Sequence, residues 1–599
     1  MPWWFGDEPL DDEPQARRLP FGQMVRRVAP MFRPHLGALA VGVLLLLVSV
    51  ACQLAGPLVL LRLIDVHVVE SSRSGVVWSA LTYAALYIVA AAATYLQVVV
   101  LTKMGLSIVA DLKRTVFGHL LRLSLAYFDK NTPGTLLARV ESDCERLQAL
   151  FSEVSIAVFR TFLLIAGMLV VMLVANWRAT LAVLALAVPL VIVTIYFFRW
   201  MRGLYQRVRH LYARISGFVT EYVQGVPILQ TFGYERRATE RLAALNQDKL
   251  VADRRASLLE YGFWGFLSAM EVAAVMVILY AGSGRSFGVA MTGGTFVLFL
   301  EYTRQAFWPL AIFAEQIGFI QRAFASADRV FGVLDTPSRT PDRKGASEAV
   351  PDDWRELTFE NLTLVYDGGT KALDDVSFSI RRGERVALVG LSGGGKTTLT
   401  NLLLRYYEPT EGRIAVDGTD IRDFTQRAWR EKIGLVLQDI HLFPGTVGDN
   451  LRALVDEIGQ ENLDRAVEIV GAEGVIAGLP KGYDEILAEG GGNLSMGERQ
   501  LLSFARAVVR DPDLLVLDEA TSSVDPGTER RLQASIDRLL AGRTSLIIAH
   551  RLATIVNADR ILVVHQGRIA EAGTHAELYA QEGIYRDLFD LQFSDGEVA

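Results

Sequence analysis

The sequence predicts a multidomain protein: an all-α domain that crosses a membrane six times, followed by an α/β domain that carries a P-loop. Three observations support this prediction. The first half holds about six apolar runs that are long enough to span a bilayer. In the second half, short β-rich runs alternate with helical runs, and a glycine-rich loop follows one of them. The length of 599 residues also fits more than one domain.

The apolar fraction differs between the two halves of the chain, and the net charge and cysteine content indicate which kinds of partner and protein class to expect. The chain is 51% hydrophobic and 21% charged, which is apolar for a soluble protein, and the apolar excess falls in the first half. A formal net charge of -7 gives no reason to expect a nucleic acid as a partner. The two cysteines form no paired framework, so nothing indicates a disulfide-stapled exported protein.

Six segments are predicted to cross the membrane as helices, since a bilayer core needs roughly 20 apolar residues per helix. They are Leu36–Leu60, Val76–Leu101, Val154–Ala175, Ala179–Phe198, Phe263–Gly282 and Phe296–Ile320. Polar residues interrupt some of these runs, so their ends are approximate.

The links between these segments predict the orientation in the membrane. The links near residues 66–75, 176–178 and 283–294 are short and carry few basic residues, whereas residues 103–153 and 199–259 are long and rich in Arg and Lys. Because Lys and Arg concentrate on the cytoplasmic side, we expect both termini and both long connections to be cytoplasmic. The protein is therefore expected in the bilayer of the cytoplasmic (inner) membrane, with helices that continue past it into water.

The chain divides into four predicted segments. Residues 1–35 form a cytoplasmic N-terminal segment without the basic start and cleavage site of a signal peptide. Residues 36–334 form the transmembrane domain, residues 335–356 a polar, proline-containing linker, and residues 357–599 the nucleotide-binding domain. The strand-like runs of the last segment include Arg385–Val389, Ile433–Leu437, Leu514–Leu517 and Ser545–Ala549, the pattern of a largely parallel α/β domain.

A P-loop follows the strand-like run at residues 386–389 and opens a helix, which is the context that this motif requires. Glycines let backbone N–H groups wrap phosphates, and the helix N-terminus favours negative charge. Lys396 can reach the β- and γ-phosphates of ATP, and the Thr397 hydroxyl can bind Mg²⁺. The predicted phosphate-binding residues are Gly390, Ser392, Gly393, Gly394, Gly395, Lys396, Thr397 and Thr398.

An acidic pair ends a second buried strand. Leu514–Leu517 is apolar and is followed by Asp518 and Glu519. We expect Asp518 to help hold Mg²⁺ and Glu519 to orient or deprotonate the attacking water. Such a pair is weak evidence alone and gains weight because it follows a P-loop.

Between these motifs lies Asn493-Leu-Ser-Met-Gly-Glu-Arg-Gln500, directly before a helical run. A P-loop, a Leu-Ser-x-Gly signature, an Asp-Glu strand end and a lone His follow one another in ABC ATPase domains, which this region resembles. The preceding region resembles the membrane part of ABC exporters with six helices per half. The resemblance covers nearly the whole chain and implies an all-α six-helix transmembrane domain followed by an α/β P-loop ABC ATPase domain.

The resemblance also assigns roles to single residues. Tyr366 is similar to the aromatic residue that stacks on adenine, and Gln438 to the glutamine that touches Mg²⁺ and the attacking water. His550 resembles the switch histidine that contacts the γ-phosphate. Ser495 and Gly497 belong to the signature, which in this family faces the nucleotide of the other subunit. The implied catalytic residues are Glu519, His550 and Gln438, and the implied Mg²⁺ ligands are Thr397, Gln438 and Asp518.

Two turns in the long cytoplasmic connections resemble the docking elements of these exporters. They lie near Asn131–Thr135 and Phe232–Arg236 and are expected to contact ATPase domains. The alternative is that they only connect helices.

Several polar side chains fall inside the predicted spans, where charges are expensive and usually face a cavity or a partner. They are Gln53, Gln97, Arg160, Glu271, Glu301, Arg304 and Gln305. Glu271 is the candidate for the substrate path, although helix–helix pairing explains it equally well.

The resulting hypothesis is an ABC half-transporter that uses ATP to export a small hydrophobic or amphipathic substrate, such as a drug, lipid or peptide. An importer built on the exporter fold, for example for a siderophore, would show the same motifs. An ATP-gated channel or regulator is a third possibility, which the Glu519 and His550 motifs disfavour.

The signature favours a heterodimer over a homodimer. Met496 and Glu498 replace the glycine and glutamine that are usual in Leu-Ser-Gly-Gly-Gln, while the hydrolytic residues of this chain are complete. If the partner is a different half-transporter, the altered signature would face only the partner's nucleotide. Glu498 would add charge near a phosphate, or it is a tolerated variant.

Overall fold

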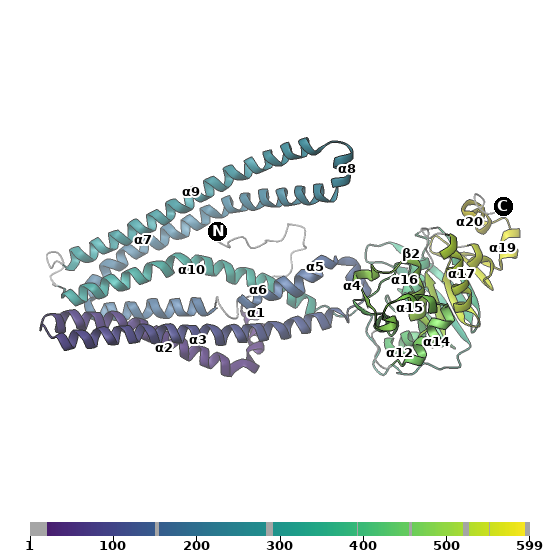
Figure 1. Cartoon of the computed structure of the whole chain (residues 1–599), viewed down its shortest axis with the longest axis horizontal. Helices are drawn as coiled ribbons and strands as arrows, with labels where there is room; N and C mark the ends of the chain where they lie inside the picture. Colours follow the sequence, from purple (N-terminus) through teal and green to yellow (C-terminus); the bar gives the residue numbers. More distant parts are fainter. Residues whose placement is uncertain are drawn as a thin grey trace. The chain divides into compact units, whose positions relative to one another are not determined.

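The computed structural model describes residues 21–149, 155–282, 291–338, 340–391, 393–453, 458–518, 526–549 and 552–593 (Figure 1). Internal contacts divide the chain into two compact units. One comprises residues up to 122 together with residues 132–336, and the other comprises residues 123–131 together with the chain from residue 337 onward. A short segment of the first half therefore belongs to the second unit.

The first unit is helical. Its long helices are α2 (Leu36–Arg62), α3 (Arg73–Leu120), α7 (Ser155–Gln224), α9 (Glu235–Gly282) and α10 (Gly293–Leu334). Shorter elements are α1 (Phe21–Val28), α5 (Pro133–Ala138), α6 (Cys144–Ala149), α8 (Val226–Thr231), a 3₁₀ turn at Ala29–His35 and π-helical turns at Leu63–Val68 and Arg139–Asp143.

Four continuous helical stretches of the described residues are long and apolar enough to cross a membrane: Gly22–Val68, Arg73–Leu120, Ile156–Gln224 and Glu235–Tyr280. The third contains a break at Asn176, where φ is -162° and ψ is 96°, so α7 is two helices joined by a tight turn. The Asn176 side chain accepts a hydrogen bond from Ala179 N at 3.2 Å and caps the second of them. With α10, these helices make the six-helix domain that the sequence predicts.

The helices extend well beyond a bilayer. At 1.5 Å per residue, the 48 residues of α3 or α9 measure about 70 Å, against a hydrocarbon core of about 30 Å. Figure 1 shows α7 and α9 side by side, with α8 closing the end of this hairpin. Phe197 and Phe263 stack between the two helices with ring centroids 3.9 Å apart.

Helix α10 packs against α2, α7 and α9 and forms the centre of the helical unit. Leu298, Phe299 and Tyr302 are fully buried, and the Tyr302 hydroxyl donates to Leu54 O at 2.6 Å. That bond falls beside Pro57, which lacks an N–H and so weakens the hydrogen-bond ladder of α2. Tyr302 thus joins α10 to α2 one residue after Gln53, whose carbonyl loses its helical N–H partner at Pro57.

The described residues of the second unit form three sheets, and this unit also includes the short helix α4 (Leu125–Lys130). The antiparallel sheet has the order β2-β1-β4-β5, with β1 at Glu356–Val365, β2 at Lys371–Arg381, β4 at Glu411–Val416 and β5 at Thr419–Asp420. A small third sheet pairs β7 (Gly445–Thr446) with β8 (Ile486–Leu487).

The central sheet has the order β12-β11-β3-β10-β9-β6, and all neighbours are parallel except β12 and β11. Its strands are β3 (Arg385–Val389), β6 (Ile433–Val436), β9 (Leu514–Asp518), β10 (Thr544–Ile548), β11 (Arg560–His565) and β12 (Arg568–Gly573). The four strand-like runs of the sequence analysis are β3, β10, β9 and β6, which lie next to one another in this order in the sheet.

This sheet is buried on both faces, which explains why its strands are apolar runs without alternation. Along β3, Ala387 and Val389 pack into one core, while Val386 and Leu388 pack into the other. The other helices of this unit are α11 (Lys396–Leu403), α12 (Gln426–Glu431), α13 (Val447–Leu451), α14 (Gln460–Val470), α15 (Glu473–Gly478), α16 (Met496–Val508), α17 (Pro526–Leu540), α18 (Leu552–Val556), α19 (His575–Ala580) and α20 (Ile584–Phe593).

Candidate ATP site

The P-loop connects the carboxyl end of β3 to α11, and close backbone packing explains its glycines. Gly390 has φ +152°, and a Cβ there would lie 2.1 Å from Val564 O. Gly395 has φ +108°, and its Cβ would lie 2.8 Å from Ala372 O. Because both neighbours are backbone atoms that cannot move aside, no residue with a side chain fits either position.

The loop is held from outside by the turn between β11 and β12. Gly567 N donates to Gly394 O at 3.1 Å, and Asp374 N donates to Gly567 O at 2.9 Å. These bonds anchor the P-loop backbone at Gly394 to the neighbouring turn, and such anchoring favours the fixed N–H geometry that phosphate binding needs.

Lys396, the first residue of α11, is 6% exposed. Its ammonium donates to Gly390 O at 2.6 Å and to Leu391 O at 3.0 Å. Burial lowers the pKa of Lys396, and the nearby Asp518 carboxylate partly offsets this effect. A phosphate would offer the ammonium stronger, charged acceptors than these two carbonyls.

Three further residues with oxygen ligands lie at the same edge of the central sheet. Thr397 follows Lys396 on α11 with an exposed side chain, Asp518 ends β9, and Gln438 lies just after β6 and is exposed. Parallel strands present their carboxyl ends at one edge, where α/β domains bind ligands. Hydroxyl, carboxylate and amide oxygens suit Mg²⁺, so the residues present fit this ion.

Tyr366 lies directly after β1 and beside the start of α11. Its hydroxyl is 3.3 Å from Thr398 Oγ1, and its ring meets that of Tyr407 edge to face with centroids 5.2 Å apart. The residue thus lies close to the P-loop helix, where a base could extend from bound phosphates. Ser392, Glu519 and His550 lie outside the described residues.

The signature forms the start of α16, with Ser495 as N-cap. Ser495 Oγ accepts from Glu498 N at 3.3 Å, while Glu498 Oε2 accepts from Ser495 N and from Ser495 Oγ, each at 2.8 Å. This is a reciprocal capping box. Sequence reasoning considered a phosphate-directed charge or a tolerated variant and missed this local role, although the Ser-x-x-Glu spacing before a helix could have revealed it.

The two residues between them differ in surroundings. Gly497 is buried, and a Cβ there would lie 2.4 Å from Thr528 Cγ2. Met496 is 39% exposed, and its sulfur accepts from the Arg499 guanidinium at 3.6 Å. A side chain at Gly497 would therefore force Thr528 to move, whereas Met496 lies where another molecule could meet it.

Helix α4, from the first long connection, lies on the same unit as the ATP site. The Tyr407 hydroxyl donates to the Asp129 carboxylate, and Lys130 forms an ion pair with Asp367. Burial, together with the Asp129 carboxylate, raises the pKa of Tyr407. Tyr407 also contacts Tyr366, so one side chain touches both α4 and the predicted adenine-stacking residue.

The docking turns of the sequence analysis are displaced from the observed short helices. Residues 131–135 follow α4, and residues 232–236 follow α8. Both helices are six residues long and too short to show a helical period in the sequence. A docking role for the second connection stays a prediction, whereas α4 of the first connection belongs to the same unit as the ATP site.

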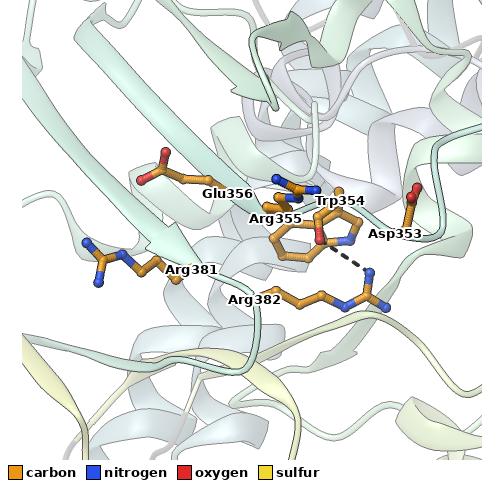
Figure 2. A pocket seen from close by; sticks show the side chains of 6 residues that line it. All are labelled: Asp353, Trp354, Arg355, Glu356, Arg381 and Arg382. Carbon is orange, nitrogen blue, oxygen red and sulfur yellow. Dashed lines mark hydrogen bonds between the residues drawn. The ribbon is translucent and has the colours of Figure 1, made fainter.

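A shallow cavity of about 500 Å³ lies elsewhere on this unit and is shown in Figure 2. It is lined by Asp353, Trp354, Arg355, Glu356, Arg381 and Arg382. Arg382 donates to Trp354 O at 3.3 Å and to Asp513 at 3.0 Å. The lining residues come from the segment leading into β1, the end of β2 and the turn before β3, so the cavity lies at the amino end of β3, whereas the P-loop follows its carboxyl end.

Some polar residues of the predicted spans form side-chain hydrogen bonds with neighbouring residues, whereas others are buried or half-buried. Gln53 donates to Ser49 at 3.0 Å, Ser49 bonds Thr94 at 2.7 Å, and Gln97 is buried on α3. Arg160 on α7 is half-buried.

Glu271, the sequence candidate for the substrate path, pairs with Arg304 at 3.3 Å between α9 and α10. Glu301 instead accepts from the neutral Gln305 amide at 2.9 Å. The structure therefore gives Glu271 the helix-pairing role that the sequence analysis left open.

Two family models match the chain. The ABC transporter transmembrane region matches residues 39–310, and the ABC transporter model matches residues 373–522. The ABC transporter ATP-binding protein exp8 of Streptococcus pneumoniae is 34% identical over 571 residues, covering 95% of this chain and 97% of the relative. An ATP-dependent lipid A-core flippase of Syntrophus aciditrophicus is 33% identical, covering 96% and 95%.

A solved structure is similar over the same extent. A bacterial Atm1-family ABC exporter with ATP bound matches with a TM-score of 0.76 and 27% identity, covering 96% of this chain and 99% of that chain. The similarity thus includes both units and the loops that join them.

Proposed function

Because this chain belongs to the ABC transporters and fuses their membrane region to their ATPase domain, we propose that it exports a hydrophobic or amphipathic substrate as one half of a dimer. The chain is an ATP-driven translocase of the exporter type. Lipid-like molecules are the favoured substrates, since several relatives are named as lipid A-core flippases. The membrane is the cytoplasmic one, with both termini on the cytoplasmic side.

The observation that carries this proposal is the position of α4. It belongs by sequence to the connection between membrane helices, yet it packs on the ATPase unit through Asp129 and Lys130. Its contact Tyr407 touches Tyr366, the predicted adenine-stacking residue. Nucleotide binding and the membrane helices thereby share one short element, as ATP-driven reorientation requires.

The residues at the carboxyl edge of the central sheet would perform hydrolysis. The P-loop and Lys396 hold the phosphates, and Thr397, Asp518 and Gln438 would hold Mg²⁺. The ion would supply positive charge to the phosphate oxygens. Glu519 orients the attacking water and accepts its proton, and His550 donates to the γ-phosphate.

A second half-transporter completes the assembly, and exposed apolar side chains support it. At the α8 end of the α7–α9 hairpin, Ile228 is 65% exposed and Phe232 is 78% exposed. These two side chains are candidates for the surface that the second half-transporter would cover. We favour a heterodimer because Met496 departs from glycine at the exposed start of α16, where a partner's nucleotide would be approached.

The direction of transport separates the proposal from its alternatives. In inside-out vesicles that contain this chain and its partner, a lipid-like fluorophore should accumulate only with ATP, and Lys396→Ala should abolish the accumulation. ATP-dependent loss of preloaded fluorophore would indicate an importer. An ion current through single molecules without net fluorophore transport would indicate a channel.

A further inference from the structure

Four polar side chains of α3 and α10 form a group at membrane depth, which we call the tyrosine–glutamate cluster: Tyr83, Tyr87, Glu301 and Gln305. Resting on the proposed function, we infer that this cluster binds the positively charged group of an amphipathic organic cation. The inference names the charge class of the substrate, which the exporter assignment alone leaves open.

The cluster lies well inside the helices. Glu301 follows the first residue of α10, Gly293, by eight residues, and Tyr87 follows the first residue of α3, Arg73, by fourteen residues. At 1.5 Å per residue these positions are about 12 and 21 Å along their helices. A carboxylate at such a depth is costly unless it faces a partner or a cavity.

Among the described residues, the carboxylate of Glu301 has no ion-pair partner. Arg160 of α7, the other guanidinium within the predicted spans, forms no ion pair among these residues either. Glu271 and Glu301 contribute two carboxylates, and Arg304 contributes one guanidinium, which pairs with Glu271 at 3.3 Å. The partner of Glu301 is the neutral Gln305 amide at 2.9 Å, and among the described residues no basic side chain forms an ion pair with it. One negative charge is therefore available to a cationic ligand.

Aromatic faces lie next to this charge. The rings of Tyr83 and Tyr87 have centroids 4.7 Å apart. Tyr302, the residue after Glu301, donates to Leu54 O of α2 at 2.6 Å, two residues before Gly56, which faces the Tyr87 ring. Behind the rings, a Cβ at Gly56 of α2 would lie 3.0 Å from the Tyr87 ring, so the absence of a side chain there gives the ring room. Tyr87 remains 36% exposed.

These features select one chemical class. Aromatic faces and a carboxylate both attract a cation, and desolvation strengthens the attraction. An organic cation with apolar substituents satisfies the charge and packs against the rings, whereas an anion of the same shape is repelled.

The test compares two probes of equal shape and opposite charge, tetraphenylphosphonium and tetraphenylborate, by equilibrium binding to the purified full-length transporter in nanodiscs. The intact protein should bind the phosphonium at least about tenfold more tightly than the borate. Glu301→Gln should weaken phosphonium binding by about tenfold and leave borate binding unchanged or stronger. Tyr87→Ala should weaken phosphonium binding, and Tyr87→Phe should retain most of it because the ring remains.

Controls keep the result interpretable. Glu240→Gln removes an exposed carboxylate that pairs with Arg236 on the cytoplasmic part of α9, so it should change neither probe. Basal ATPase activity, measured on every preparation, reports folding. Unchanged phosphonium binding in active Glu301→Gln protein, or equal binding of both probes by the intact protein, would overturn the inference. Absence of ATPase activity in the intact protein would count against the proposed function instead.

Discussion

At the residue scale, the signature shows how a substituted residue can serve its own helix. Glu498 replaces the usual glutamine, and its carboxylate accepts from both Ser495 N and Ser495 Oγ. The capping bonds therefore explain Glu498 without any interaction between its carboxylate and a bound phosphate. Met496 is the remaining departure, and its partial exposure keeps it relevant to a partner.

Two substitutions of Glu498 should distinguish its role in capping α16 from any effect of its negative charge. Glu498→Gln retains an acceptor for Ser495 N, so ATPase activity should survive heating as in the intact protein. Glu498→Ala removes the reciprocal cap, a loss of about 1 kcal/mol, and should lower the temperature at which ATPase activity disappears. The measurement is residual activity after heating, and equal loss for both variants would show that the cap is not the important feature.

Tyr366 offers a second test at this scale. Tyr366→Ala removes ring stacking and should raise the ATP concentration for half-maximal hydrolysis more than it lowers the maximal rate, because no reacting atom is touched. Tyr366→Phe loses only the contact with Thr398 and should resemble the intact protein. If Tyr366→Ala leaves the ATP requirement unchanged, the adenine assignment is wrong.

At the scale of elements, the sequence predicts long features better than short ones. The six spans and the four central strands could be predicted because apolar runs of the right length have few alternative structures. Helices α4 and α8, each six residues long, carry no such pattern. Their positions depend on tertiary contacts, such as that between Asp129 and Tyr407, which no local pattern encodes.

Removal of the α4 contacts should uncouple transport from hydrolysis. Exposed ion pairs contribute roughly 0–1 kcal/mol each, so a single change should have little effect. Asp129→Ala combined with Lys130→Ala should keep basal ATPase activity but lose stimulation by substrate. The matched control is Arg413→Ala, which breaks the exposed Arg413–Glu360 pair on the same unit. Normal stimulation in the double variant would contradict a coupling role for α4.

At the scale of the whole molecule, the proposed dimer would combine the P-loop of one chain with the signature of the other at each ATP site. The P-loop and signature motifs were both predictable because their chemistry fixes their residue types and order. The substrate path could not be predicted from the sequence. Glu271 was the candidate for it, but whether Glu271 faces a substrate or pairs with Arg304 depends on how α9 and α10 pack. An ion pair between two membrane helices cannot be predicted from the sequence of either helix alone.

Coexpression tests the heterodimer. This chain expressed with the product of a neighbouring gene should yield a complex that hydrolyses ATP at one of its two sites, while the chain alone should be much less active. Trapped nucleotide counted per complex provides the measurement. A stable homodimer in which both sites turn over at a normal rate would exclude the asymmetric arrangement.

The central claim is that hydrolysis by this chain drives transport, and Glu519→Gln tests it most directly. The purified transporter in proteoliposomes should bind ATP as before but hydrolyse it about 10²–10⁴-fold more slowly, because a positioned general base is lost. ATP-dependent substrate accumulation should fall in the same proportion. Near-normal hydrolysis, or transport that continues without it, would contradict the account.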